Sequence, residues 1–192
     1  MDDLLDQRPI IVGIAGPNGA GKSTFYEAFL RQAGLRYINA DEIGRVLGID
    51  AYAAAKVADG MRRELVARRE SFIFETVFSD PVGEKVAFLE SAAAEGYSVV
   101  LCFVGLDSAE TSDTRVAMRV TQGGHDVPPD KIVQRYPRTL ANLVRAVEVL
   151  PAVLIYDNSD LARPFELIAE YRDGMAIQRG KAVPRWFKRL KI

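Results

Sequence analysis

Nine consecutive residues, Gly16–Thr24, combine glycines, a lysine and two hydroxyls in an order that suits phosphate binding. The first eight, through Ser23, fit the pattern G-x-x-x-x-G-K-[ST]. Glycines let the backbone curl so that successive N–H groups face one anion, and the helix that follows adds partial positive charge at its N-terminus. Lys22 is expected to reach the β- and γ-phosphates of a nucleotide, and Ser23 to ligate Mg²⁺. The predicted nucleotide contacts are Gly16, Asn18, Gly19, Ala20, Gly21, Lys22, Ser23 and Thr24.

Basic residues that could close over the phosphates follow much later, between 115 and 138. Arg115 and Arg119 are four residues apart and therefore share a helix face. A glycine-rich loop with the only histidine, His125, comes next. Small P-loop kinases carry phosphate-clamping arginines in a helical lid of this kind. We expect Arg115, as a catalytic residue, and Arg119 to contact the nucleotide, and His125 and Arg138 to contact the substrate. The open alternatives are solvated surface charges and, for His125, a loop cap.

Two carboxylates follow predicted strands. Asp41 comes after the strand 35–38, and Glu75, with Thr76, ends the strand 71–76. Parallel strands present their carboxyl ends at one edge, where ligands bind, so we expect these residues to contact the acceptor and Asp41 to orient its hydroxyl. Asp41 could instead cap a helix and Glu75 hold a backbone amide, or either could bind Mg²⁺ through water. Asn158 follows the strand 152–156, where P-loop kinases often wrap adenine, although a plain turn fits equally well.

The elements that must position these residues alternate between strand and helix. Further strands are expected at 9–15 and 98–104, and helices at 22–32, 51–69, 81–94, 109–121, 130–136 and 138–150, the last two hinged at Pro137. This order predicts an α/β fold of the P-loop NTPase type, a kinase-type three-layer sandwich with a central, mainly parallel five-stranded sheet. From about 164 a β-hairpin turning at Asp173-Gly174 precedes a basic tail. We expect a single domain over 1–192 with its lid at about 115–138.

Composition excludes several classes of protein. The apolar fraction is 48%, the charged fraction 27% and the formal net charge −1, as in an ordinary globular chain, which disfavours nucleic-acid binding. The only cysteine, Cys102, rules out a disulfide framework. The acidic N-terminus does not resemble a signal peptide, and no apolar stretch approaches the ~20 residues that span a bilayer. These features predict a cytoplasmic protein without a membrane partner.

Taken together, six segments resemble the short, zeta-toxin-like P-loop kinases. This resemblance implies binding of ATP and Mg²⁺. Characterised zeta toxins phosphorylate the 3′-hydroxyl of UDP-N-acetylglucosamine. By position, Lys22 matches the family's P-loop lysine, Asp41 its catalytic aspartate, Arg115 a phosphate-binding arginine, and Glu75 a carboxylate lining the sugar site. The six segments are Gly16–Thr24, Ile38–Ile43, Phe74–Thr76, Gly123–Pro128, Arg135–Leu143 and Tyr156–Ser159.

The sequence therefore predicts an ATP-dependent kinase that transfers the γ-phosphate to a hydroxyl of a small molecule. The resemblance leaves room for an antitoxin-like protein partner, which the residues themselves do not identify. A signalling GTPase would need an Asn-Lys-x-Asp guanine reader, and the chain has none. The alternative left open is a nucleotide-binding regulator that hydrolyses ATP slowly.

Overall fold

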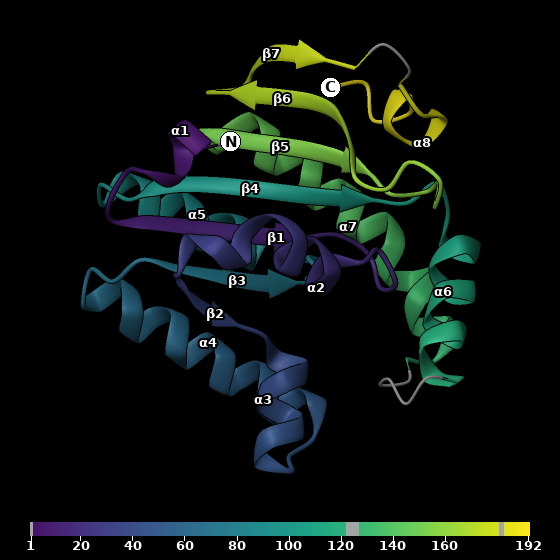
Figure 1. Ribbon diagram of the computed structural model, residues 1–192, viewed down its shortest axis with the longest axis horizontal. Coiled ribbons are helices and arrows are strands. Elements are labelled where there is room, and N and C mark those ends of the chain that lie inside the picture. The colour runs from purple at the N-terminus through teal and green to yellow at the C-terminus, as the bar shows by residue number, and fades with distance from the viewer. Residues whose placement is uncertain (1, 122–126, 181–182) are drawn as a thin grey trace.

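The computed structural model describes residues 2–121, 127–180 and 183–192, which form one seven-stranded sheet with helices on both faces (Figure 1). The strand order is β2-β3-β1-β4-β5-β6-β7. The first five strands along the chain run parallel, whereas β6 is antiparallel to β5 and β7 to β6. The strands are β1 (Ile10–Ala15), β2 (Arg36–Ile38), β3 (Phe72–Thr76), β4 (Ser98–Gly105), β5 (Ala152–Asp157), β6 (Glu166–Arg172) and β7 (Met175–Arg179).

The predicted α/β kinase-type fold is confirmed, but the prediction of five strands is wrong. The C-terminal hairpin was expected as a separate element, and it instead extends the sheet. Ala152 of β5 pairs with Arg172 of β6, and Ile168 and Tyr171 are buried. Pairing with the hairpin satisfies the backbone groups along the edge of β5, which would otherwise stay open.

Strand β1 lies at the centre, between β3 and β4, and all six of its residues are buried. Parallel strands covered on both faces are apolar throughout, so the sequences of β1 and β4 lack the alternation of a half-exposed strand. In register, Ile14 pairs with Glu75 on one side and with Cys102 on the other. The carboxyl end of β1 therefore opens directly beside the carboxyl end of β3.

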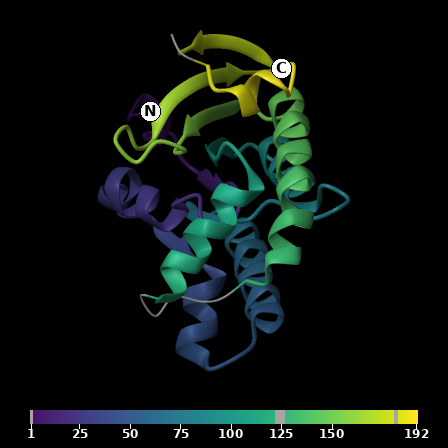
Figure 2. The ribbon, with the colours of Figure 1, turned by 90° about the vertical axis from the view of Figure 1, so that its right-hand side faces the viewer.

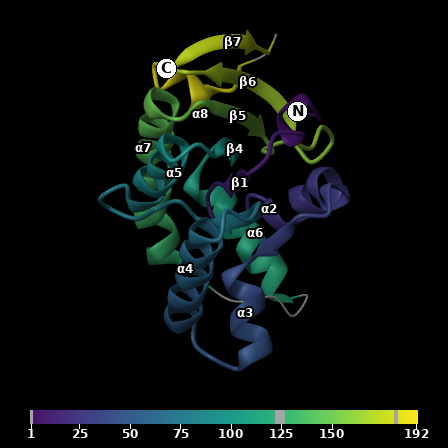
Figure 3. The ribbon, with the colours of Figure 1, turned by 90° about the vertical axis from the view of Figure 1, so that its left-hand side faces the viewer.

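Helices α4, α5 and α7 cover one face of the sheet, and α2 covers the other (Figure 3). The helix after β1 is continuous in three parts: α2, the π-helical turn η1 and the 3₁₀ turn η2, which ends at Gly34 with φ 64°. The helical elements are α1 (Asp2–Leu5), α2 (Lys22–Phe25), η1 (Tyr26–Leu30), η2 (Arg31–Ala33), α3 (Ala40–Leu47), α4 (Ala51–Ala67), α5 (Glu84–Ala94), α6 (Ala109–Thr121), α7 (Pro129–Val149) and α8 (Arg185–Lys188).

Two predicted helix boundaries are corrected. Helix α7 runs through Pro137 as one helix rather than as two hinged pieces. A proline inside a helix costs about 3 kcal/mol, and the buried residues Ile132, Leu143 and Ala146 on the same helix offset that cost. Helix α5 begins at Glu84 instead of Pro81, because Gly83 adopts a left-handed conformation and the Asp80 carboxylate accepts the Glu84 N–H.

The hairpin turn and the C-terminal tail are each held by specific local features. Asp173 and Gly174 both have positive φ, 47° and 75°, as a two-residue hairpin turn requires, so the predicted turn is confirmed. Trp186 of α8 is buried, and its indole Nε1 donates to Asp157 Oδ1 over 2.8 Å. The ring lies against Gly105 at the end of β4, where a Cβ would stand 2.2 Å from it. The tail is thereby attached to the ends of β4 and β5.

Among residues 2–121, 127–180 and 183–192, no helix has the length and apolar character needed to cross a membrane.

We predict that Gly105→Ala destabilises the protein by about 1–3 kcal/mol, because overpacking forces the indole ring away. Trp186 is the only tryptophan, so its fluorescence reports that displacement directly. Gly60→Ala in α4 is the matched control, since a Cβ there meets nothing within 4 Å, and it should stabilise the helix by about 1 kcal/mol. Equal effects of both substitutions in urea unfolding would contradict the proposed packing.

Candidate active site

The loop after β1 is held by close backbone contacts on three sides. A Cβ on Gly16 would stand 2.1 Å from the carbonyl oxygen of Val104 in β4, and one on Gly19 would stand 2.8 Å from that of Ser112 in α6. The Ser112 hydroxyl donates to the carbonyl of Asn18. Asn158 Nδ2 donates to the carbonyl of Ala20 over 2.8 Å. Only a glycine-rich loop can lie this close to β4 and α6.

Lys22 opens helix α2 and is buried, with 7% of its surface exposed. Its Nζ donates to the carbonyl of Pro17 over 3.0 Å. Burial lowers the pKa of Lys22 below its usual range, and Arg119 adds to that shift, whereas Glu75 and Asp41 oppose it. The ammonium group thus lies inside the loop, where nearby negative charge does not fully offset the cost of its burial. A bound phosphate would supply the missing negative charge.

Glu75, at the end of β3, joins three elements through one carboxylate oxygen. Its Oε2 accepts from the Ser23 hydroxyl over 2.8 Å, from the Tyr37 hydroxyl over 2.6 Å and from Asn39 Nδ2 over 3.2 Å. Burial, followed by the nearby Glu75, raises the pKa of Tyr37, so this hydroxyl remains a donor. The Tyr37 ring stacks on Tyr26 with centroids 3.7 Å apart. This network places the carboxylate beside the hydroxyl that was predicted to ligate Mg²⁺.

Asp41 lies in the first turn of α3, and the cap of that helix is Asn39. The Asn39 side chain accepts the N–H groups of Asp41 and Glu42 over 2.8 and 3.3 Å. The alternative in which Asp41 itself caps the helix is therefore excluded. Its carboxylate acts electrostatically on Lys22 instead.

The basic residues of the lid separate into two groups. Arg119 faces the site: it lines the cavities beside the loop and acts on Lys22, and Lys131 and Arg135 also line the first cavity. Arg115, four residues earlier, donates to the carbonyl of Ser159 over 3.0 Å. Arg138 is exposed and does not line these cavities. His125 lies outside the residues that the structure describes. Roles for Arg115, Arg138 and His125 in ligand binding stay predictions.

Asn158, predicted near adenine, uses its side chain within the protein. Its amide donates to Ala20, and its Oδ1 accepts the Phe165 N–H over 3.3 Å. In this structure its side chain links the phosphate-binding loop to the segment that follows β5.

A cavity of about 360 Å³ connects the loop to the carboxylates at the carboxyl edge of the sheet. Figure 2 views this edge, with α6 and the start of α7 beside it. A second cavity, of about 730 Å³, adjoins the first and is lined by Ser23 and α3. Asn39, Ala40, Asp41, Ala51 and Arg119 line both cavities. Asp41 therefore stands where two ligand-sized spaces meet.

Helix α7 holds the loop that lines the first cavity. Thr139 Oγ1 donates to the carbonyl of Val77 over 2.9 Å, and Asn142 Nδ2 donates to those of Phe78 and Asp80, both over 2.9 Å. Phe78 has a positive φ of 63°, which a non-glycine residue adopts only when its surroundings hold it there. The segment Arg135–Leu143, which resembles the zeta-toxin-like kinases, thus has a physical role: through Thr139 and Asn142 it holds the loop of residues 77–80.

Among the cavity residues that sequence reasoning missed are two cations, Arg62 of α4 and Lys85 of α5. A weak signal existed for Arg62. Ala51, Ala55, Ala58 and Arg62 recur at helical spacing, which places small residues and then a cation on one face. Lys85 carried no signal, because only the packing of α5 brings it to the cavity.

Comparison with known families agrees with the resemblance. A family model described as Zeta toxin matches residues 50–166, more than half of the chain. This chain belongs to the zeta toxin family. The matched range begins after the phosphate-binding loop and Asp41. In this zeta toxin family member, the roles of the phosphate-binding loop and of Asp41 therefore rest on the sequence motif and on the geometry of the site.

One relative by sequence is a protein of Haemophilus influenzae (strain ATCC 51907 / DSM 11121 / KW20 / Rd), described as an uncharacterized protein. It is 28% identical over 129 residues, which cover 63% of this chain and 88% of the relative.

Solved structures share the fold at low identity. The AvrRxo1-ORF1:AvrRxo1-ORF2 complex with sulphate ions matches with a TM-score of 0.64 and 14% identity over 98% of this chain, which spans about two thirds (66%) of the matched chain. A putative kinase from Chloroflexus aurantiacus J-10-fl has a TM-score of 0.58 at 18% identity, covering 82% of this chain and 90% of that one. The PezAT toxin–antitoxin system of Streptococcus pneumoniae has a TM-score of 0.55 at 16% identity, covering 96% and 77%. Together, family and fold support a kinase-type phosphotransferase.

We predict that Lys22→Met raises the melting temperature of the ligand-free protein. The lowered pKa means that the folded chain binds this proton less tightly than the unfolded chain, so the charge opposes folding at neutral pH. The gain in melting temperature from Lys22→Met should shrink as pH rises toward about 10.4, the usual lysine pKa, because Lys22 then loses its charge in the wild-type protein. Thermal shift with and without MgATP measures both effects, and the variant should lose the stabilisation that the nucleotide confers. Unchanged nucleotide stabilisation would refute the assigned role of Lys22.

A second substitution tests whether α7 stabilises the loop of residues 77–80, which lines the first cavity. Asn142→Ala leaves the carbonyls of Phe78 and Asp80 without this donor and should cost about 1–3 kcal/mol in urea unfolding. Gln134→Ala, at an exposed position of the same helix, is the control, with an expected change within about 0.5 kcal/mol. A loss of stability no larger than that of the control would show that the loop does not depend on α7.

Proposed function

We propose that this protein is an ATP-dependent kinase that transfers the γ-phosphate of ATP to a hydroxyl group of a small molecule. The observation that carries the proposal is the 360 Å³ cavity, which joins Lys22 of the phosphate-binding loop to the carboxylates Asp41 and Glu75. A nucleotide-binding module without an acceptor would have no use for a space on the far side of the γ-phosphate.

Each residue has a role that its position supports. Lys22 and the loop N–H groups hold the phosphates, and Arg119 neutralises charge that spreads over the transferred group. Asp41 accepts a hydrogen bond from the acceptor hydroxyl and orients its oxygen for in-line attack. We retain Arg115, Arg138, His125 and Thr76 as proposed contacts, to be tested individually.

The residues present fit Mg²⁺. The Ser23 hydroxyl and the Glu75 carboxylate are hard oxygen donors 2.8 Å apart at the mouth of the loop. No group of three or more His, Cys, Asp or Glu side chains among the described residues could hold a metal alone. Kinase Mg²⁺ is bound by one or two side chains together with phosphates and water, so such a group is not required. When bound, Mg²⁺ would neutralise phosphate charge.

The acceptor and the partner are part of the proposal. Family membership makes UDP-N-acetylglucosamine the first acceptor to test. A structure of the AvrRxo1-ORF1:-ORF2 complex with ATP, at 13% identity and a TM-score of 0.62, supports ATP as the donor. The toxin–antitoxin description of PezAT supports an antitoxin-like protein as partner. We place the protein in the cytoplasm, where ATP is available.

The decisive experiment measures ATP consumption with a panel of UDP-sugars and other hydroxylated metabolites. Asp41→Asn should lower kcat by about 10²–10⁴-fold if Asp41 also takes the hydroxyl proton in the transition state, with little change in the affinity for ATP. Glu90→Gln, an exposed carboxylate on α5, is the charge-matched control and should keep wild-type turnover. Full acceptor-dependent turnover by Asp41→Asn would refute its assignment. ATP binding without stimulation by any acceptor would instead favour the slow regulator.

A further inference from the structure

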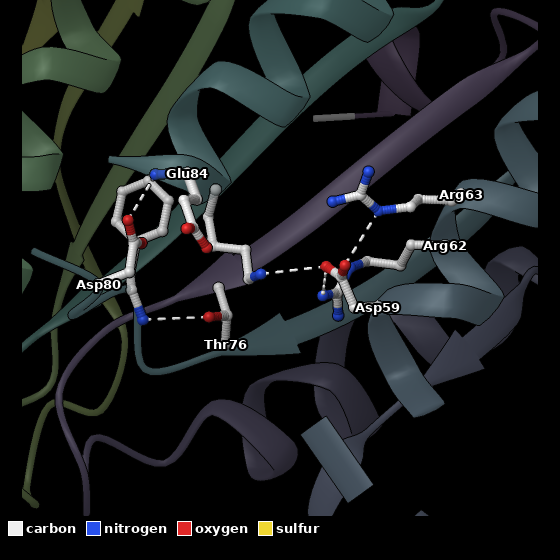
Figure 4. Close-up of polar contacts among 8 residues, drawn as sticks. Asp59, Arg62, Arg63, Thr76, Asp80 and Glu84 are labelled. Carbon is white, nitrogen blue, oxygen red and sulfur yellow. Dashed lines mark hydrogen bonds and ion pairs between the residues drawn. The ribbon is translucent and has the colours of Figure 1, made fainter. Parts of the chain in front are cut away.

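A cluster of charges lies where α4 and α5 meet the cavity, on the opposite face of β3 from Glu75. Asp59 accepts from Arg62 over 2.8 Å, from Arg63 over 3.0 Å and from Lys85 over 3.1 Å (Figure 4). Both Arg62 and Lys85 contact the same oxygen, Oδ1, so their cationic groups converge on one point. Three cations share one carboxylate, which leaves the cluster with net positive charge.

Arg62 is the unusual member of the cluster. Only 4% of it is exposed, and its guanidinium lies over the Phe74 ring, with 5.0 Å from Cζ to the centroid. Within the part of the chain that the structure describes, its Nε is buried and has no hydrogen-bond partner. A buried charged group with an unused donor is costly unless a further acceptor reaches it.

The same end of the cavity contains a second unused group. Asp80 is held by α5, because its Oδ1 accepts the Glu84 N–H, whereas its Oδ2 is buried and has no partner among the described residues. Arg62, Lys85, Asp80 and Thr76 all line the 360 Å³ cavity, and we call this region the α4–α5 end. It offers cationic donors and one hydrogen-bond acceptor.

An ion pair that only fastens α4 to α5 would not need these features. Lys85 and Asp59 already connect the two helices. Arg63 contributes to the same carboxylate from an exposed position, with 75% of its side chain accessible, and does not line the cavity. Arg62 and Lys85 instead face the space that the proposed acceptor would occupy.

We propose that the α4–α5 end binds an anionic group, a carboxylate or a phosphate, at the part of the acceptor remote from the reacting hydroxyl. Arg62 and Lys85 pair with that anion, and Asp80 Oδ2 accepts from a neighbouring hydroxyl. The acceptor is thereby a hydroxylated acid rather than a neutral sugar or polyol. This inference deepens the proposed kinase function and rests on it for the identity of the ligand as an acceptor.

Matched pairs of acid and neutral compounds test the inference. The probes are gluconate against sorbitol and glycerol 3-phosphate against glycerol, measured by calorimetry with a non-hydrolysable ATP analogue and by turnover with ATP. At least one acid should bind ~10-fold or more tightly than its neutral partner, because charge-assisted hydrogen bonds are about twice as strong as neutral ones. Whether gluconate or glycerol 3-phosphate shows the preference distinguishes a carboxylate site from a phosphate site.

Variants at the cluster separate binding from structural support. Lys85→Met should weaken binding of the preferred acid about 10-fold and raise its KM without lowering kcat, and Lys85→Arg should restore both values. Arg63→Met removes a cation from the same Asp59 and should leave acid binding unchanged. Urea unfolding of each variant monitors the structural contribution of the lost ion pair.

Three outcomes would overturn the inference: no preference for either acid, equal weakening by Lys85→Met and Arg63→Met, or turnover of UDP-N-acetylglucosamine that neither variant changes. Acid binding that depends on Lys85, with no phosphoryl transfer to any member of the acceptor panel, would support the anion site and count against the kinase proposal. The two proposals can therefore fail separately.

Discussion

The close approach of the phosphate-binding loop to β4 and α6 is the constraint on which the rest of the site depends. Gly16 lies against the Val104 carbonyl and Gly19 against that of Ser112, at distances that leave no room for a side chain. The Ser112 hydroxyl and the Asn158 amide then hold the loop from the ends of different elements. A loop fixed in this way has its backbone conformation set before any ligand arrives, which reduces the ordering that binding would require.

This arrangement is possible because β1 is the central strand of a parallel sheet. Its neighbours β3 and β4 end at the same edge, so the Glu75 carboxylate comes within hydrogen-bond distance of the Ser23 hydroxyl. The same carboxylate receives Tyr37 and Asn39 from β2 and the start of α3. One partly buried network thus aligns the loop with the helix that carries Asp41, and a change in one of its members should affect the others.

The site also concentrates charge that does not favour folding. Lys22 is buried with incomplete compensation, and Arg62 is buried with an unused donor. Functional sites commonly keep such groups, and the surrounding structure stabilises the fold instead. Here the apolar strands β1 and β4 and the side chains of α7 that hold residues 77–80 supply that stability.

The sequence by itself determined the local features: the loop Gly16–Thr24 after a buried strand, the alternation of strand and helix, and the turn at Asp173-Gly174. Each depends on residues adjacent in the chain, through glycine conformation, hydrophobic periodicity and turn preference. The tertiary structure alone decided that the hairpin extends the sheet and that α7 continues through Pro137. It also decided that Arg119 rather than Arg115 faces the cavities, and that Arg62 and Lys85 reach one of them. These outcomes follow from packing between segments far apart in the chain, which local patterns do not encode.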